Sequence, residues 1–409
     1  MNVIKKQIVL VGIIFTCCQY GCTPTLKKSD DLSITVACYY FPNYHTRDTT
    51  DLPVSRQHFD NWSEWELLKQ ARPRFEGHDQ PKIPAWGYTD EKDPKVMEQK
   101  IRAAYTCGVD VFIFDWYTYE GKPFLHRCLD EGFLKARNTD SIRFALMWAN
   151  HDWSELFPYT AGDERDYLYD GKVTSEIFDS IGDDLIRKYF TKPNYWLIDG
   201  KAYFSIYDIQ NFIHSFGSLE ATNREMEKLN EKAIKAGLKG VHWNLVAWGT
   251  AILPGQDAPV NQKELIDKLG FDSATSYVWI HHAGLKDATN DYNAIRDEYM
   301  KHWDQVTKEY GVPYYPNVSM GWDSSPRTNQ TKEWKHDYGY PYTGIIVNNT
   351  PANFRTALQL TKDRLLSVPD GPRILNINCL NEWTEGSYLE PDIVHGMKYL
   401  NAVKEVFGK

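Results

Sequence analysis

Two glutamates near the end of the chain, Glu382 and Glu385, stand three residues apart in the run Asn381-Glu382-Trp383-Thr384-Glu385. They follow an apolar run, residues 374–380, that predicts a strand. Glycosidic cleavage needs one carboxyl group to protonate the leaving oxygen and another to act as base or nucleophile. Like charges in an aromatic pocket raise the pKa of one of them. The spacing therefore allows this chemistry, although two surface glutamates that bind backbone amides would show the same pattern.

Aromatic, carboxylate and amide residues gather where the predicted strands end. The C–H face of a sugar ring stacks on an aromatic ring, and its hydroxyls need fixed hydrogen-bonding partners. For each residue alone, core packing or a buried structural role explains its position as well as sugar binding does. For the whole set, core packing is the weaker explanation. The candidate substrate-binding residues in this set, with Trp86 from the loop 42–92, are Tyr40, Asp115, Trp116, Tyr117, Asn150, Trp153, Tyr207, Trp248, Tyr277 and Trp383.

Eight short apolar runs have strand character, and most are continuous rather than alternating. Continuous runs are typical of strands buried on both faces of a parallel sheet. The eight runs are residues 34–41, 109–116, 143–148, 202–207, 241–247, 273–279, 314–320 and 374–380.

Helical patterns lie between these runs, and Gly237, Gly270 and Gly311 follow three of them, where a left-handed residue often ends a helix. The alternation predicts a single α/β domain, a (β/α)8 TIM-type barrel with long loops, 42–92 and 150–173, at its C-terminal face. A doubly wound sheet is the rival, but no GxGxxG turn follows the first strand. The helical ranges are 93–107, 175–189, 220–236, 261–269, 292–310, 353–367 and 396–407.

The composition excludes several classes of protein. The chain has 409 residues, a net charge of −9 and 42% hydrophobic residues, which is too apolar for a disordered chain. An acidic balance argues against a nucleic-acid partner and suits a neutral sugar better than a sulfated or uronic-acid-rich one. Aromatic residues make up 14%, including 14 Trp and 26 Tyr. We attribute much of this surplus to a glycan-binding cleft rather than to a large core.

The first residues resemble an export signal. Lys5 and Lys6 precede a short apolar run, 8–15, and Cys22 follows a small residue, as in bacterial lipoprotein signals. We expect residues 1–22 to be the signal, Cys22 to be lipidated, 23–32 to be a polar tether and 33–409 to be the catalytic barrel. The chain would then be an exported cell-envelope lipoprotein, on the cell surface or facing the periplasm, that meets the membrane only through its anchor. A plain cleaved signal peptide is the alternative.

Neither a metal site nor a cofactor is predicted. Cys38, Cys107, Cys128 and Cys379 are widely spaced, without CxxC or zinc-finger spacing. Cys38 and Cys379 fall in apolar runs and are expected to be buried thiols, while a disulfide among the four stays open. His281-His282 does not predict a metal pair, because adjacent strand residues point to opposite faces.

The run from Asn381 to Pro391 resembles the NEWxEGxxLEP motif of WbsX-like proteins and the related motif of family 99 glycoside hydrolases. Further segments resemble WbsX-like chains and extend the likeness over nearly the whole mature chain. They are Ser63-Glu64-Trp65 with Gly77-His78-Asp79-Gln80-Pro81, Trp148-Ala149-Asn150, and Ile198-Asp199-Gly200-Lys201.

This resemblance implies a (β/α)8 barrel that acts on glycans, with Glu64 and Trp65 as further candidate substrate-binding residues. Family 99 contains retaining endo-α-mannosidases and endo-α-mannanases. Carried over, Glu382 deprotonates the sugar 2-hydroxyl to give a 1,2-anhydro intermediate, and Glu385 is the general acid and then the base. One motif differs from the family pattern. WbsX-like chains usually read WANEN, whereas here His151 and Asp152 follow Trp148-Ala149-Asn150.

The leading hypothesis is an exported glycoside hydrolase. A glycosyltransferase is the first alternative, because WbsX-like proteins are often labelled so. Export would separate the chain from cytoplasmic nucleotide sugars, and no diphosphate-binding loop or Asp-x-Asp motif is evident at a strand end. A non-catalytic glycan-binding lipoprotein is the second alternative. It predicts a degenerate carboxylate pair, whereas both Glu382 and Glu385 are present.

Overall fold

The computed structural model describes residues 33–47, 50–55, 61–155, 158–257, 261–369 and 371–408. The expected signal peptide with Cys22 and the tether 23–32 lie outside the described residues. Among the described helices, none combines the length and the apolarity that crossing a bilayer requires.

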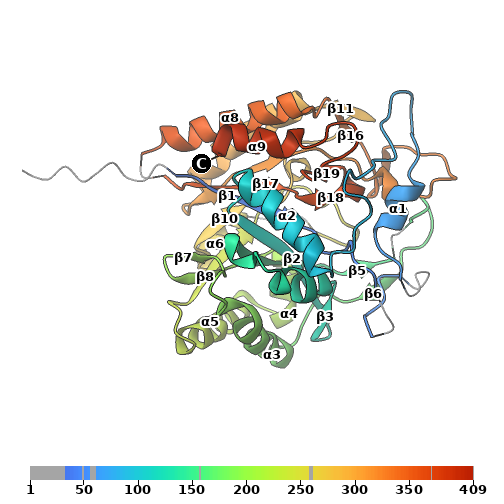
Figure 1. Cartoon of the computed structure of the whole chain (residues 1–409). Helices are drawn as coiled ribbons and strands as arrows, with labels where there is room; N and C mark the ends of the chain where they lie inside the picture. The colour runs from blue at the N-terminus through green and yellow to red at the C-terminus, as the bar shows by residue number, and fades with distance from the viewer. Residues whose placement is uncertain are drawn as a thin grey trace, which may run out of the picture. The chain divides into compact units, whose positions relative to one another are not determined.

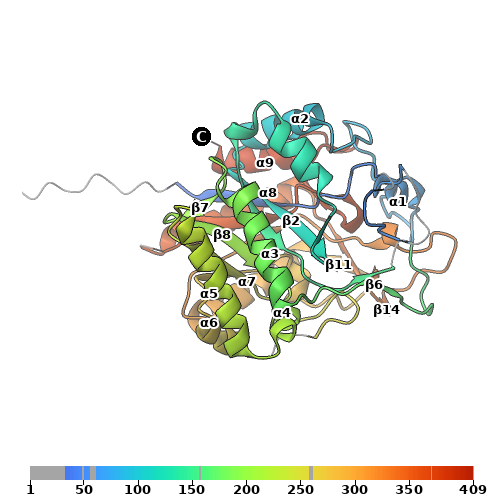
Figure 2. The same cartoon turned by 90° about the horizontal axis from the view of Figure 1, so that it is seen from below.

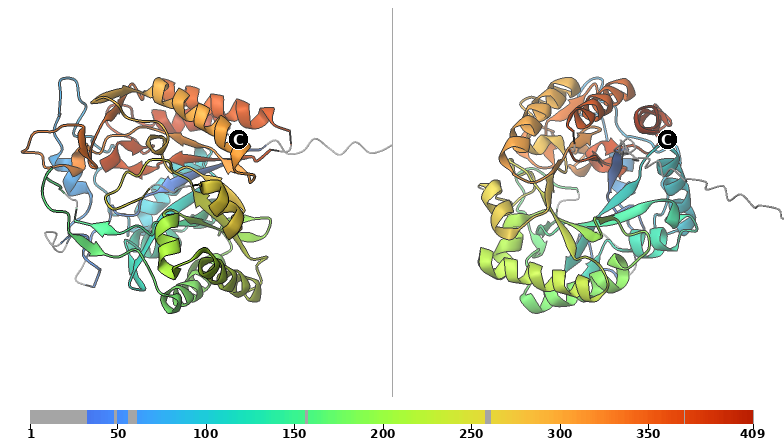
Figure 3. Two further views of the ribbon diagram at one scale, coloured as in Figure 1. Left: turned by 180° about the vertical axis from the view of Figure 1, so that it is seen from behind. Right: turned by 90° about the vertical axis from the view of Figure 1, so that its left-hand side faces the viewer.

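Parallel strands form the centre of the fold, and helices surround them (Figure 1; Figure 3, right). The strands pair in chain order from β1 to β10, and β17 pairs with the other edge of β1, Thr35 opposite Ile374. The predicted (β/α)8 barrel is therefore confirmed. Its strands are β1 (Thr35–Tyr40), β2 (Val111–Tyr119), β4 (Arg143–Trp148), β8 (Lys201–Ile206), β9 (Val241–Val246), β10 (Ser273–Thr275), β12 (Tyr314–Tyr315), β13 (Asn317–Ser319) and β17 (Ile374–Asn378).

The barrel closes at its seventh strand, which is divided. β12 pairs with β10 and β13 pairs with β17, and Pro316 stands between the two halves. Proline has no amide hydrogen for a sheet ladder, so the strand can change partners there. The prediction of one strand over 314–320 is therefore wrong in its continuity. The prediction of a strand over 273–279 is too long, because Thr275 already lies opposite the last residues of both neighbouring strands, Val246 and Tyr315.

All seven predicted helices are present, with ends shifted by a few residues. Asp93, Ser218 and Thr350 each accept a hydrogen bond from a first-turn amide and so begin a helix. Gly237, Gly270 and Gly311 have positive φ, as expected. Sequence analysis did not find α1 and α4. The helices are α1 (Trp65–Gln70), α2 (Pro94–Thr106), α3 (Ser175–Leu185), α4 (Ile209–Phe216), α5 (Leu219–Lys235), α6 (Gln262–Leu269), α7 (Tyr292–Glu309), α8 (Pro351–Ser367) and α9 (Lys398–Phe407).

Short strands and single helical turns build the loops. The two long loops lie at the C-terminal end of the barrel strands, as predicted, where α1, β6 and the hairpin β18–β19 gather (Figures 1 and 2). The short strands are β3 (Lys122–Phe124), β5 (Trp153–Ser154), β6 (Tyr167–Tyr169), β7 (Leu197–Ile198), β11 (Thr289–Asp291), β14 (Asp337–Gly339), β15 (Tyr342–Thr343), β16 (Ile345–Val347), β18 (Asn381–Glu382) and β19 (Ser387–Tyr388). The helical turns are Cys128–Gly132, Phe133–Lys135, Thr139–Ser141, Ile186–Phe190, Trp279–His281, Ser325–Arg327 and Trp383–Glu385.

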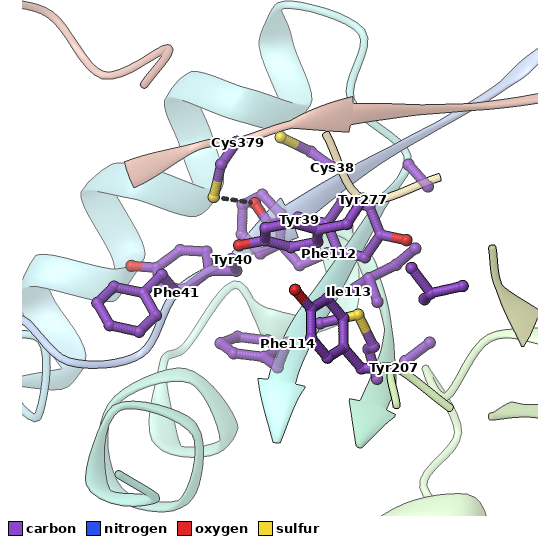
Figure 4. Close-up of a cluster of buried hydrophobic side chains, with 14 of the residues drawn as sticks. Cys38, Tyr39, Tyr40, Phe41, Phe112, Ile113, Phe114, Tyr207, Tyr277 and Cys379 are labelled. Atoms are coloured by element: carbon purple, nitrogen blue, oxygen red, sulfur yellow. Dashed lines mark hydrogen bonds between the residues drawn. The ribbon is translucent and has the colours of Figure 1, made fainter. Parts of the chain in front are cut away.

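Tyrosine and cysteine side chains are prominent in the buried cluster around β1 (Figure 4). The ring of Tyr39 lies 4.8 Å from that of Tyr277, and the Cys379 thiol donates to the Tyr39 carbonyl at 3.0 Å. Cys38 and Cys379 are buried thiols, as expected, and Cys107 and Cys128 are buried and free as well.

A buried ion cluster joins α2 to the loop that carries the two glutamates. The Lys100 ammonium lies 2.6 Å from Glu91 and 2.7 Å from Glu390, and all three side chains are almost fully buried. Glu91 also accepts from the Asn381 amide at 2.9 Å, and Glu390 accepts from the Trp383 indole at 3.0 Å. Burial alone would lower the pKa of Lys100, but the two carboxylates outweigh it and raise that pKa. Lys100 therefore supports the residues on both sides of Glu382.

Replacing Lys100 with Met should lower the free energy of unfolding by about 3–5 kcal/mol, because two buried carboxylates lose their cation. Urea denaturation measures this. The matched control is Lys263→Met, whose partner Asp267 is as exposed as Lys263 itself at 52%. That variant should stay within about 0.5 kcal/mol of the wild type. Equal stability of the two variants would contradict a supporting role for Lys100.

Candidate active site

The two glutamates lie on a tight hairpin after β17. Glu382 ends β18, Glu385 ends the helical turn that follows, and Ser387 pairs back onto Glu382. Gly386 between them has a φ of +65°, and a Cβ there would lie 2.7 Å from the Cβ of Asp323. The Asp323 amide donates to the Glu385 carbonyl at 2.6 Å. The hairpin is therefore pressed against the loop that follows β13, and only glycine fits at that contact.

One buried guanidinium holds both glutamates. Arg327 Nη2 donates to Glu382 Oε1 at 2.6 Å, and Nη1 donates to Glu385 Oε1. Its Nε donates to Glu64 Oε1 at 3.1 Å, and Glu64 is in turn fixed by the Thr384 hydroxyl at 2.7 Å. Arg327 therefore binds three carboxylates from two loops far apart in the sequence.

A second link joins Glu382 to Asp115 at the end of β2. The Tyr277 hydroxyl lies 2.9 Å from Asp115 Oδ2 and 3.4 Å from Glu382 Oε2. One hydroxyl hydrogen cannot serve two ionised carboxylates, so the arrangement favours a proton on one of them. Asp115 Oδ1 is buried without a hydrogen-bond partner among the described residues.

The charges do not balance if every group is ionised. Three buried carboxyl groups, those of Glu64, Glu382 and Glu385, bind one guanidinium, and a fourth, that of Asp115, is joined to Glu382 through Tyr277. Burial raises the pKa of Glu382 well above its ordinary value; Arg327 opposes this, and Glu385 and Asp115 reinforce it. Burial likewise raises the pKa of Glu385 and, well above its ordinary value, that of Asp115. The cluster can therefore hold a proton at neutral pH, as a general acid must.

Three of these carboxyl groups, those of Asp115, Glu382 and Glu385, line a pocket of about 80 Å³ at the C-terminal end of the barrel, together with Arg327. The rest of the lining is mostly aromatic and apolar side chains, many of them from the ends of β4, β8, β9 and β10, and Figure 4 shows the rings of Tyr207 and Tyr277 in this region. Carboxyl groups beside aromatic rings suit a sugar ring. Seven candidate residues line the pocket: Asp115, Tyr117, Trp153, Tyr207, Tyr277, Glu382 and Glu385.

Five aromatic candidates do not line this pocket and pack within the protein instead. Tyr40 donates to Glu91 at 2.8 Å, and Trp65 packs against Tyr44 with ring centroids 4.2 Å apart. The other three fill space behind the pocket: the Trp248 indole donates to the Tyr207 carbonyl, Trp383 stacks on Tyr388 at 3.8 Å, and Trp116 meets Trp148 edge-on. These five are Tyr40, Trp65, Trp116, Trp248 and Trp383.

Three further candidates also lie outside the pocket lining. Glu64 binds Arg327 from behind, and Asn150 exchanges two hydrogen bonds with the Asp208 backbone, at 2.7 and 2.8 Å. Trp86 is half-buried and away from this pocket. Our interpretation of the aromatic surplus as mainly a cleft is therefore wrong. Large aromatic side chains fill much of the core, because five tryptophans, at 148, 196, 248, 279 and 383, are under 2% exposed.

Sequence analysis missed Arg327 and Tyr340, and it noted His151 and His281 without assigning either a role in the site. Arg327 lies seven residues beyond the predicted strand 314–320, but nothing in the sequence shows that an arginine in a loop is buried among carboxylates. Among the described residues, no group of three His, Cys, Asp or Glu side chains is arranged to hold a metal ion.

A family model described as glycosyltransferase WbsX matches residues 36–403. The chain belongs to the WbsX family. Two relatives, each named uncharacterized protein WxcX, come from two strains of Xanthomonas campestris pv. campestris. Each is 24% identical over 397 residues, covering 93% of this chain and 50% of the relative. The chain thus spans about half the length of these relatives.

Solved glycosidase structures share the fold of this WbsX-family chain. The GH99 endo-alpha-mannosidase from Bacteroides thetaiotaomicron superposes with a TM-score of 0.51 at 14% identity, covering 90% of this chain and 95% of that one. A structure titled glycoside hydrolase-like protein gives 0.55 at 14% identity, covering 92% and 94%. The expected kinship with WbsX-like proteins is confirmed, and these neighbours share the TIM-barrel fold.

The raised pKa of Glu382 predicts a pH-dependent stability difference. Above about pH 4.3 an unfolded glutamate loses its proton, whereas the folded chain keeps one proton on the pair of Glu382 and Glu385, so the pair's contribution to stability falls as pH rises. Replacing Glu382 with Gln removes one member of the pair and with it this loss. Relative to the wild type, the free energy of unfolding of the variant should therefore rise as the pH increases above about 4.5, by up to about 1.4 kcal/mol per pH unit.

Urea denaturation across this pH range measures the difference. Buried histidines titrate in both proteins and cancel in the comparison. Glu231→Gln, whose glutamate is 64% exposed on α5, controls for the substitution itself. A Glu382→Gln curve that runs parallel to the wild type at every pH would contradict the raised pKa.

Proposed function

We propose that this WbsX-family chain is a glycan-active enzyme, a retaining glycoside hydrolase. The observation that carries the proposal is the pocket in which Glu382 and Glu385 share one buried guanidinium within a lining rich in aromatic rings. Two carboxyl groups with raised pKa in a largely buried, aromatic site match the requirements of glycosidic cleavage.

We assign the acid/base role to Glu385. In the first step its proton passes to the leaving oxygen, while Glu382 takes the proton of the sugar 2-hydroxyl and the 2-oxygen closes on the anomeric carbon. In the second step water opens this 1,2-anhydro ring: Glu385 takes the proton from water, and Glu382 returns its own to the 2-oxygen. Tyr340 donates to Glu385 at 2.8 Å and supports its charged form when the proton has left.

A neutral sugar fits the charges of the site best. Of the described residues that line the pocket, Arg327 is the one lysine or arginine, and three carboxylates already bind it. A diphosphate would therefore meet carboxyl groups with no free cation, which argues against a nucleotide-sugar donor in this pocket and so against the transferase alternative. The fold shared with a GH99 endo-alpha-mannosidase makes α-mannosides the first substrates to test.

Export remains part of the proposal. Lys5, Lys6 and the apolar run 8–15, followed by Cys22, support a lipoprotein signal. Replacing Cys22 with Ala in the full chain should move the protein from the membrane fraction to the soluble fraction of a bacterial host. Unchanged membrane association, measured by fractionation and immunoblotting, would count against a lipid anchor at Cys22.

Replacing Glu385 with Gln should lower kcat on a natural glycan by about 10²–10⁴-fold, because the leaving oxygen loses its proton donor. A dinitrophenyl glycoside needs no such proton, so the same variant should cleave it with a much smaller loss. Glu382→Gln should slow both substrates. Product analysis and stopped assays on the two substrates separate the roles.

A broad glycan panel tests the proposal itself. Release of sugar by the wild type supports the hydrolase. Binding without release, or release of nucleotide from nucleotide sugars, would favour the binding-protein or the transferase alternative instead. Full activity of Glu385→Gln on natural glycans would overturn its acid/base role.

A further inference from the structure

His151 is a pocket residue to which the proposed mechanism gives no role. It follows β4 and lines the pocket, and it is only 9% exposed. Its ring is roughly parallel to that of Trp153 at 6.1 Å and meets Tyr117 and Tyr207 edge-on, each at 5.8 Å. Three aromatic neighbours therefore fix the plane of this imidazole.

A hydrogen bond at Nδ1 defines the tautomer of His151. His151 Nδ1 lies 2.9 Å from the Asp152 backbone carbonyl, and a carbonyl can only accept. Nδ1 must therefore carry a hydrogen. Burial lowers the pKa of His151, so the neutral ring is the stable form near pH 7. In a neutral ring with a hydrogen on Nδ1, Nε2 is a lone-pair acceptor.

Hydrogen bonds and a close backbone contact fix the chain around His151. The Tyr119 hydroxyl donates to the His151 carbonyl at 3.1 Å, and Asp152 Oδ1 accepts from the Gly171 amide at 2.9 Å. A Cβ at Gly171 would lie 2.4 Å from the Asn150 carbonyl, so this close approach requires glycine. The imidazole is thus placed before any ligand arrives, as a specificity contact should be.

His281 provides an internal comparison. It lines the same pocket, and its Nδ1 also donates to a carbonyl, that of Thr250, at 2.9 Å. Its Nε2, however, already lies 3.3 Å from the Tyr207 hydroxyl, which supplies the donor. His151 Nε2 has no such donor among the described residues. The two histidines share one tautomer, but of the described side chains and amides none donates to Nε2 of His151.

We propose that His151 determines sugar specificity by accepting a hydrogen bond at Nε2 from one hydroxyl of the bound glycan. This inference rests on the proposed function and adds a recognition contact on a pocket side chain other than the carboxyl groups. A site built to accept from a hydroxyl discriminates against a sugar that lacks it, because the buried acceptor is then left unpaired.

The test measures binding without turnover, in full-length protein that carries Glu385→Gln. The probes are methyl α-mannoside, α-glucoside and α-galactoside with their monodeoxy forms, titrated by NMR. His151→Phe keeps the ring packing on Trp153 and removes the acceptor, whereas His151→Gln places a carboxamide oxygen near the position of Nε2. His302→Phe is the control, because His302 stacks on His282 at 3.8 Å and does not line the pocket.

We expect His151→Phe to weaken binding of the preferred glycoside about tenfold. One monodeoxy form should bind this variant and its parent equally, because it lacks the hydroxyl that His151 would accept. His151→Gln should restore most of the affinity, and His302→Phe should change nothing.

Two results would overturn the inference. Equal weakening of every monodeoxy form would mean that His151 only supports the pocket wall, and no weakening at all would mean that it does not touch the sugar. In both cases the proposed function stands if the wild-type chain cleaves glycans. If none of the probes binds and the glycan panel yields no product, the proposed function fails and this inference fails with it.

Discussion

The candidate site depends on one buried cation. Arg327 is the shared partner of Glu64, Glu382 and Glu385. Without it, three buried carboxylates would lie close together with no cation between them. A buried ion group of this kind adds little net stability, but it demands good geometry from every member. Its main effect here is therefore positional. Both glutamates bind adjacent nitrogens of one rigid guanidinium, which fixes them relative to each other.

The barrel makes this convergence possible. Parallel strands bring their C-terminal ends to one rim, so Asp115 after β2, Arg327 after β13 and Glu382 after β17 meet although they are far apart in the sequence. A second buried ion cluster supports the residues at this rim. Lys100 binds Glu91 and Glu390, and these two carboxylates hold the residues on both sides of Glu382. The site thus has an inner ion cluster around Arg327 and an outer one around Lys100, and the hairpin β18–β19 lies between them.

The sequence predicted what depends on local pattern. Continuous apolar runs located the strands, the helical patterns between them located the helices, and the family motif placed Glu382 and Glu385 at the end of the last barrel strand. The sequence did not predict features that depend on contacts between distant residues. The strand 314–320 is divided at Pro316, and its two halves pair with different neighbouring strands. Trp383 stacks inward on Tyr388 rather than lining the pocket. The role of Arg327 could not be predicted for the same reason, because its partners Glu64 and Glu382 lie 263 and 55 positions away in the sequence.

The balance of donors and acceptors decides what the pocket can recognise. The donors of Arg327 bind the protein's own carboxylates, so the pocket offers a ligand mostly acceptors: the carboxyl oxygens of Glu382 and Glu385 and, as we propose, His151 Nε2. An anionic sugar would bring more acceptors and more negative charge to the same side. A neutral sugar brings hydroxyl donors, and each that reaches a buried acceptor removes the cost of leaving that group unpaired. Discrimination among neutral sugars must then come from which hydroxyls meet which acceptors. If His151 accepts from the sugar as proposed, it and the carboxyl groups follow different strands, β4 and β17, and together can accept hydrogen bonds from two hydroxyls of one ring.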